Sequence, residues 1–145
     1  MTVKANKLPS VLLDENIAGK GWEIVEDVKP SKFEVKDLEL VSFLEKDKDE
    51  ESVKGEVVRQ RAVSLRANLG LDDAKYVLDH QIEIPVEFRG KFLLFPGTLF
   101  DCLHIVCLFW KDGQWQPCFL PVGFGFDFDD VDLLVRSKSA RNAQA

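Results

Sequence analysis

The sequence has no long apolar run and no apolar segment close to its first residue. No stretch approaches the ~18 consecutive apolar residues that read as a membrane-spanning helix. The opening MTVKANKLPS lacks the apolar core of a secretion signal. These two absences predict a cytoplasmic protein with no membrane partner. The chain also lacks a phosphate-cradling glycine loop, a Gly-x-Ser-x-Gly elbow and a His-Glu-x-x-His helix, so it carries no strong catalytic signature.

Cysteine and histidine are scarce as well. The 145 residues include 3 cysteines and 2 histidines. An odd cysteine count in a chain without an export signal predicts reduced thiols. The one group of soft metal ligands is Cys102, His104, Cys107 and Cys118. It has no Cys-x-x-Cys pair, and strand geometry would place Cys107 on the face opposite Cys102 and His104. We therefore expect buried thiols, no zinc and no cofactor.

A thiol- or histidine-dependent hydrolase is the main alternative function. Cys102 and His104 could supply a nucleophile and a base, and Asp101 is adjacent to them. Side chains at positions i and i+2 of a strand start about 6.5–7 Å apart, which is poor geometry for a direct thiol–imidazole pair. We therefore expect a protein that is not an enzyme. His80, the second histidine, is expected to cap the C-terminal end of a short helix.

The charge balance is acidic. The formal net charge is -6 and the isoelectric point is near 5.0, which repels a phosphate backbone and makes nucleic acid an unfavoured partner. Arg59, Arg61 and Arg89 could still gather into a local basic patch. Binding of single-stranded nucleic acid is therefore the second alternative function.

The acidic residues concentrate near the end of the chain. Asp127, Asp129 and Asp130 offer the oxygen ligands that calcium and magnesium prefer. Phe128 and Val131 interrupt any EF-hand pattern. We expect an exposed turn here rather than a metal site.

Residues 33–88 predict three strands and one helix. The charged stretch KDKDEESVK, residues 46–54, is expected to be a solvated loop. Before it, residues 33–35 and 38–44 predict a strand. After it, residues 57–65 alternate in part and predict the second strand of a long hairpin, with a helix over 55–67 as the open alternative. Asp72 can cap a short helix whose apolar positions are Ala74, Val77 and Leu78. Residues 82–88 alternate strictly and predict a half-buried strand.

Asp112-Gly113 is the strongest hairpin signal in the chain because apolar runs flank it on both sides. A two-residue loop fixes the register by counting, and the predicted pairs are Lys111 with Gln114, Trp110 with Trp115, Cys107 with Cys118, and Val106 with Phe119. A three-residue loop would shift this register by one residue. Pro117 and Pro121 fall where their missing N–H groups face away from the partner strand, which places their strand at a sheet edge or beside a bulge.

Both faces of this hairpin are apolar, which indicates a closed barrel, a sandwich or a partner. Further strands are expected over residues 91–95, 123–128 and 131–135. Ten of the 11 phenylalanines lie at or after Phe43, so the densest core should lie in the second half.

These patterns together predict an α+β, mostly β fold. We expect a small antiparallel, partly closed barrel or bent sheet of SH3-like size with one short helix. Residues 11–136 would form a single globular domain, residues 1–10 a frayed N-terminus and residues 137–145 a disordered tail. The predicted function is a non-enzymatic interaction module. Its predicted contact residues, for a protein partner or a second copy of the chain, are Trp110, Trp115 and Phe119.

Overall fold

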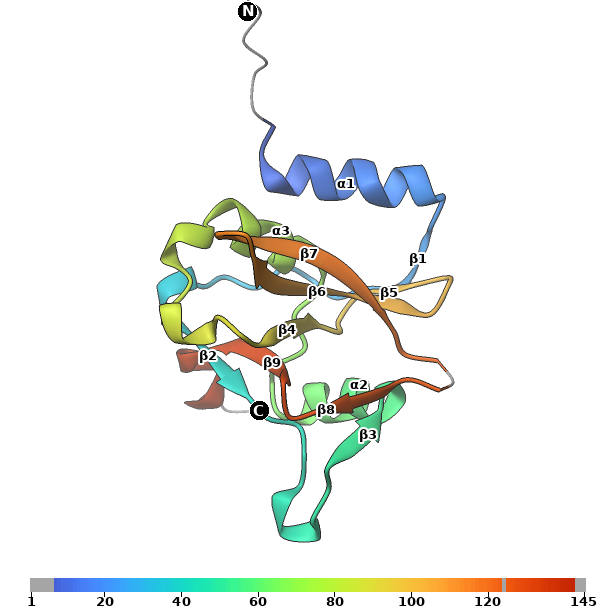
Figure 1. Ribbon diagram of the computed structural model, residues 1–145, viewed down its shortest axis with the longest axis vertical. Coiled ribbons are helices and arrows are strands. Elements are labelled where there is room, and N and C mark those ends of the chain that lie inside the picture. Colours follow the sequence, from blue (N-terminus) through green and yellow to red (C-terminus); the bar gives the residue numbers. More distant parts are fainter. Residues whose placement is uncertain (1–6, 124, 143–145) are drawn as a thin grey trace, which may run out of the picture.

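A five-stranded mixed sheet forms the middle of the molecule, with strands in the spatial order β2-β9-β4-β6-β7 (Figure 1). The computed structural model describes residues 7–123 and 125–142. The five strands are β2 (Leu38–Val41), β4 (Phe92–Phe95), β6 (His104–Lys111), β7 (Gln114–Pro121) and β9 (Asp132–Ser137). Two smaller antiparallel pairs accompany this sheet, namely β1 (Ile24–Glu26) with β5 (Leu99–Phe100) and β3 (Ser52–Lys54) with β8 (Asp127–Asp129).

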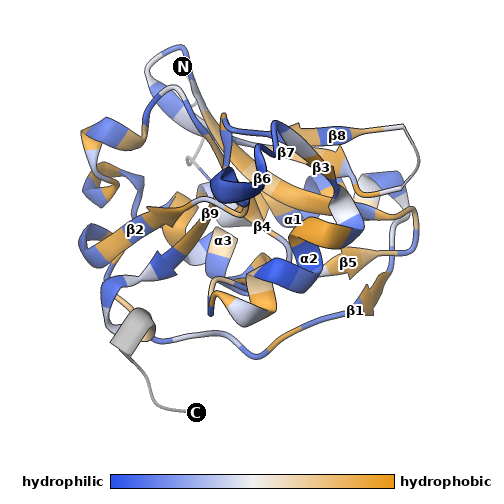
Figure 2. Cartoon of the chain, turned by 90° about the horizontal axis from the view of Figure 1, so that it is seen from below, coloured by the Kyte–Doolittle hydropathy of each residue, from blue (hydrophilic) through white to orange (hydrophobic). Residues whose placement is uncertain are grey.

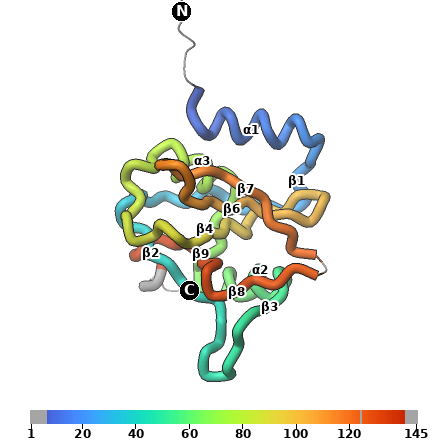
Figure 3. Tube along the Cα trace, in the orientation of Figure 1, coloured from blue at the N-terminus to red at the C-terminus, as the bar shows by residue number. Residues whose placement is uncertain are grey.

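Helices cover both faces of the central sheet. Helices α1 (Pro9–Lys20) and α3 (Leu71–Asp79) lie on one face, and α2 (Gly55–Ser64) lies on the other beside β3 and β8 (Figures 1 and 3). Alternate residues of β6 serve the two layers. Val106 and Leu108 belong to the core that α1 and α3 cover, whereas Ile105 and Cys107 belong to the core that α2 covers. The apolar residues accordingly concentrate on the central strands (Figure 2). Both apolar faces of the middle of β6 are therefore buried by segments of the same chain, whereas most of β7 is half-buried.

The α+β class is confirmed, but the finer expectations of the fold need correction. The described strands do not close into a barrel, and the main sheet is mixed because β4 and β9 run parallel. Three helices are present among the described residues instead of one, and helix (35%) exceeds strand (31%). The helices remove the need for a barrel, since they cover the faces that closure would otherwise have to protect.

The hairpin register is confirmed in full. Lys111 pairs with Gln114, Trp110 with Trp115, and Cys107 with Cys118. Asp112 and Gly113 both have positive φ angles, 54° and 80°, as a two-residue type I′ turn requires. β7 is an edge strand of the main sheet, as its two prolines predict.

Residues 55–64 form helix α2, so the strand expected over 57–65 is wrong and the helical alternative is right. Val58 and Ala62, one turn apart, are fully buried, whereas Val63 is 63% exposed. Val57, Val63 and Leu65 are separated by even numbers of residues, which suggested one face of a strand, but they do not form a common buried face. The residues that reach the core repeat with the period of a helix.

Residues 82–88 do not form a strand. They form two consecutive 3-10 turns, Gln81–Glu83 and Val86–Phe88. Ile84 and Phe88 are buried, but Ile82 on the same predicted face is 95% exposed. Pro85 between the two turns cannot donate a ladder hydrogen bond, and backbone bonds such as Glu83 N–H to His80 O close the turns locally.

Helix α3 confirms the helix predicted here, with a different cap. Its N-cap is Gly70 rather than Asp72. Both oxygens of the buried Asp73 carboxylate accept backbone hydrogen bonds, one from the N–H of Gly70 (3.1 Å) and one from that of Ser31 (2.8 Å). Burial raises the pKa of this carboxyl. Asp73 thereby joins the start of α3 to the loop that precedes β2.

Other segments differ from expectation at their ends. The strand expected over 38–44 ends at Val41, and residues 33–35 lead into a 3-10 turn, Val35–Asp37. β8 occupies only Asp127–Asp129 of the strand expected over 123–128, and residue 124 lies outside the described residues. Within the expected N-terminal fray, residues 1–6 lie outside the described residues and Pro9 begins α1. Within the expected tail, Ser137 ends β9, residues 138–142 form a 3-10 turn, and residues 143–145 lie outside the described residues.

Candidate functional site

Cys102 and His104 lie next to each other without forming a thiol–imidazole pair. Cys102 is in the turn that follows β5, and His104 begins β6. The Nδ1 atom of His104 lies 3.0 Å from the backbone oxygen of Cys102, and its ring centroid lies 5.0 Å from that of Trp22. Burial raises the pKa of the Cys102 thiol. The surroundings therefore disfavour the thiolate that a nucleophilic cysteine needs.

Cys107 and Cys118 form a disulfide across β6 and β7, with their Cα atoms 5.2 Å apart. The expectation of reduced thiols is wrong for this pair, and Cys102 is the free cysteine. The predicted register already placed the two cysteines opposite each other, and this Cα spacing lies within bridging distance. Among the described residues, no group of three or more His, Cys, Asp and Glu side chains is arranged to hold a metal ion.

The acidic residues near the end of the chain organise the turn between β8 and β9. Asp129 accepts the backbone N–H of Val131 (3.1 Å), and Asp132 accepts that of Asp129 (3.0 Å). Asp127 forms an ion pair with Lys54 of β3. Asp130 is exposed on the turn. The candidate cation ligands thus have structural contacts instead: Asp129 stabilises the tight turn, Asp127 stabilises the β3–β8 pair, and Asp130 is exposed.

The three arginines proposed for a basic patch contact different parts of the molecule. Arg59 donates to the Pro96 carbonyl (3.3 Å) and to Glu26 (2.9 Å). Arg61, on another side of α2, donates to the Phe43 carbonyl (2.9 Å) and pairs with Glu50. This pairing holds the pKa of the Glu50 carboxyl at about 2. Arg89 lies over the Trp110 ring, 3.7 Å from its centroid.

Three aromatic rings on or beside the edge strand β7 are only partly buried. We call Trp22, Trp110 and Phe119 the aromatic surface. It has two parts: Trp22 and Phe119 are in edge contact with centroids 5.0 Å apart, and Trp110, four positions along β6 from the partner of Phe119, meets Trp115 at 5.8 Å. Trp115 itself is only 3% exposed, so it is a core residue and is not available as an anchor.

Two cations lie over the aromatic surface. The ammonium of Lys20 is 5.1 Å from the Trp22 centroid and 5.6 Å from that of Phe119, and Arg89 stacks on Trp110. Neither Lys20 nor Arg89 has a carboxylate partner among the described residues. The surface therefore combines apolar rings with two positive charges that no acidic group of residues 7–123 and 125–142 neutralises by contact.

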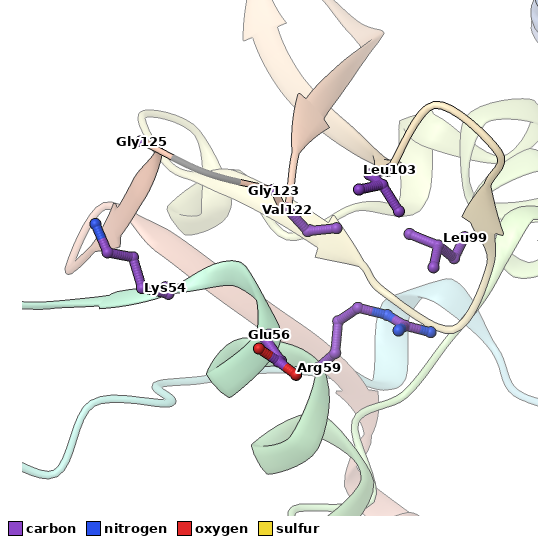
Figure 4. A pocket seen from close by; sticks show the side chains of 8 residues that line it. All are labelled: Lys54, Glu56, Arg59, Leu99, Leu103, Val122, Gly123 and Gly125. Carbon is purple, nitrogen blue, oxygen red and sulfur yellow. The ribbon is translucent and has the colours of Figure 1, made fainter.

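A cavity of about 600 Å³ lies between the start of α2, the turn that precedes β6 and the segment after β7 (Figure 4). Leu99, Leu103 and Val122 supply its apolar wall, and Lys54, Glu56 and Arg59 supply charged groups. Its volume is within the range of pockets that bind small molecules.

Comparison with known proteins gives no assignment: no protein-family model, curated protein or solved structure matches the chain. None of the helices in the described part of the chain combines the length and apolar composition that crossing a bilayer requires. Any function must therefore be argued from the aromatic surface and the cavity themselves.

Sequence reasoning named two of the three rings of the aromatic surface and missed Trp22. It also missed Lys20 and the cavity, whose walls come from segments far apart in the chain. A local signal existed for Lys20 and Trp22, because Gly21 between them ends α1 in a left-handed conformation with φ 71°. That turn brings the lysine back over the indole ring.

Proposed function

We propose that the protein is a non-enzymatic interaction module that binds an acidic segment of a protein partner on its aromatic surface. The carrying observation is that Lys20 and Arg89 lie over half-buried rings without a carboxylate partner in the described chain. Other lysines and arginines of the described chain also lack an ion pair, but Lys20 and Arg89 differ from them in lying over aromatic rings. A partner carboxylate could bind them while its apolar side chains cover the rings.

Side chains rather than backbone would carry this contact. β7 is the edge strand nearest the rings, and Pro117 and Pro121 remove two of its backbone donors. Addition of a partner strand along β7 would therefore leave gaps in the hydrogen-bond ladder. Contact through the exposed parts of Trp110 and Phe119 does not need that ladder.

The alternatives have weaker support. A thiol enzyme would need a thiolate at Cys102, and burial favours the protonated thiol. Nucleic acid could stack on the same rings, but the overall charge opposes it. The cytoplasmic location stays a proposal, and in that reducing compartment the Cys107–Cys118 disulfide would be transient or absent.

The test uses three fluorescent probes on the purified protein. They are a peptide rich in Glu and Leu, the same peptide with Lys in place of Glu, and oligothymidylate. The acidic peptide should bind best, and Lys20→Ala with Arg89→Ala should weaken it about tenfold, since two exposed charge contacts contribute up to ~1 kcal/mol each. Lys29→Ala with Lys32→Ala removes the same charge from an exposed segment elsewhere and should leave binding nearly unchanged.

Two outcomes would contradict the proposal. Equal weakening by both double variants would mean that only net charge matters. Tighter binding of oligothymidylate than of the acidic peptide would favour the nucleic-acid alternative. Sedimentation of the protein alone shows whether a second copy is the acidic partner, in which case Lys20→Ala with Arg89→Ala should dissociate it.

A further inference from the structure

A second cavity, of about 320 Å³, adjoins the 600 Å³ cavity along the exposed face of α2. Glu56 and Arg59 line both cavities. The Arg59 side chain is held at this boundary, since it donates to the Pro96 carbonyl and to Glu26. The two cavities are therefore adjacent compartments that meet at the Arg59 side chain.

The first compartment offers an apolar wall to a ligand. Leu99 at its base is buried, whereas Leu103 is 49% exposed and lies with its side chain toward the cavity (Figure 4). Leu103 has a φ of 61°, a left-handed conformation that costs about 1 kcal/mol or more for a residue with a side chain. Backbone bonds on both sides hold it there, from its own N–H to Phe100 O (2.9 Å) and from Val122 N–H to its oxygen (2.8 Å). Glycine or asparagine would suit this backbone better, so the presence of an exposed leucine suggests that its side chain contacts a ligand.

The charges around the compartments favour a cation. Lys54 is paired with Asp127, and Arg59 is paired with Glu26. Glu56 is exposed and has no ion pair among the described residues. The second compartment adds the carboxylate of Asp27, which already accepts hydrogen bonds from Thr98 and Val28. An anionic ligand would have to displace an existing ion pair, whereas a cation would meet an unpaired carboxylate directly.

We propose that the two compartments together bind an amphipathic amine. Its apolar chain lies against Leu99, Leu103 and Val122 in the larger cavity, and its ammonium group binds Glu56 at the boundary with the smaller one. This site lies on α2 and does not include the aromatic surface. It stands or falls independently of the proposed protein partner.

The experiment compares three probes of equal chain length, nonylamine, nonanol and nonanoate, by calorimetric titration of the full chain. Nonylamine should bind tightest and nonanoate weakest. Glu56→Gln should weaken nonylamine about three- to fivefold, as expected for one exposed ion pair, and should leave nonanol unchanged. Glu83→Gln is the matched control, because Glu83 is exposed on the 3-10 turn after α3 and the substitution changes the net charge equally.

The apolar wall is tested by Leu103→Asn. Asparagine tolerates the left-handed backbone, so this variant should keep its thermal midpoint while it weakens both nonylamine and nonanol. Equal affinity for nonylamine and nonanol would overturn the assigned charge. Tighter binding of nonanoate, unchanged binding to Leu103→Asn, or no binding of any probe would overturn the site.

Discussion

Gly55, the first residue of α2, lies against the segment that follows β7, and replacing it tests how tightly the two are joined. A Cβ added at Gly55 would lie 2.6 Å from both the Cα and the Cβ of Val122. Non-bonded carbons prefer about 3.5–4.0 Å, so either α2 or the Val122 segment must move by about 1 Å. A rotamer change cannot relieve this contact, because one of the atoms is backbone and the Val122 N–H is bonded to Leu103 O.

The net effect of Gly55→Ala is a competition between two terms. Alanine in a helix gains up to ~1 kcal/mol over glycine, and less at the first position than in the interior. Overpacking costs about 1–3 kcal/mol. We therefore expect Gly55→Ala to lower the free energy of unfolding by about 1–2 kcal/mol. Because Val122 and Glu56 line the cavity, the displaced segments should also weaken nonylamine binding.

Gly19 of α1 provides the matched control. A Cβ added there meets nothing within 4 Å, so Gly19→Ala should raise the free energy of unfolding by about 0.5–1 kcal/mol. Urea unfolding followed by tryptophan fluorescence measures both variants. If Gly55→Ala is as stabilising as Gly19→Ala, the close approach of α2 to Val122 is refuted.

Two further predictions concern stability. The Cys107–Cys118 bond closes a loop with a sequence separation of 11 residues, so adding a reductant should lower the free energy of unfolding by about 3 kcal/mol. In urea titrations, the reductant should lower the free energy of unfolding of Cys102→Ser by the same amount, because Cys102 is not part of this bond. If the reductant has no effect, the bond is absent. Because burial raises the folded-state pKa of Asp73 above its unfolded value, the native state binds more protons than the unfolded state between these two pKa values. The stability of the wild type relative to Asp73→Asn should therefore be highest below the unfolded pKa and fall as pH rises through the folded one. Urea midpoints of both proteins from about pH 3 to about pH 7 measure this difference, and a constant or opposite difference would contradict the burial of the charge.

Local chemistry explains which parts of the fold could be predicted. Asp112-Gly113 specifies its own turn type, so counting outward from it gave every pair of the β6–β7 ladder. The strand predicted from the strict alternation over 82–88 was wrong. Pro85 lacks a backbone donor, and the backbone hydrogen bonds of this segment close two 3-10 turns instead of a strand ladder. Helix α1 was not predicted, although Pro9 in its first turn and Gly21 just after its end are typical helix signals. The exposed Leu8, Val11 and Leu12 blur the helical period, because only Leu13 and Ile17 are apolar residues of its buried face.

The candidate sites depended on contacts between distant segments. Cys102 and His104 are near neighbours in sequence, but Cys102 lies in the turn that follows β5, so the strand geometry expected for this pair does not apply to it. The cavity could not be predicted in that way, because Leu99, Glu56 and Val122 belong to three segments that only the tertiary fold brings together. The same limit applied to Trp22, whose contact with Phe119 spans most of the chain.

The position of β9 has a consequence for how the chain folds during synthesis. β9 is the last strand of the main sheet to leave the ribosome, yet it lies between β2 and β4 and pairs with both. Until residues 132–137 emerge, β2 has no partner in this sheet and one edge of β4 is open. The nascent chain must therefore carry exposed apolar strands through most of its synthesis, a state in which aggregation and chaperone binding compete with folding.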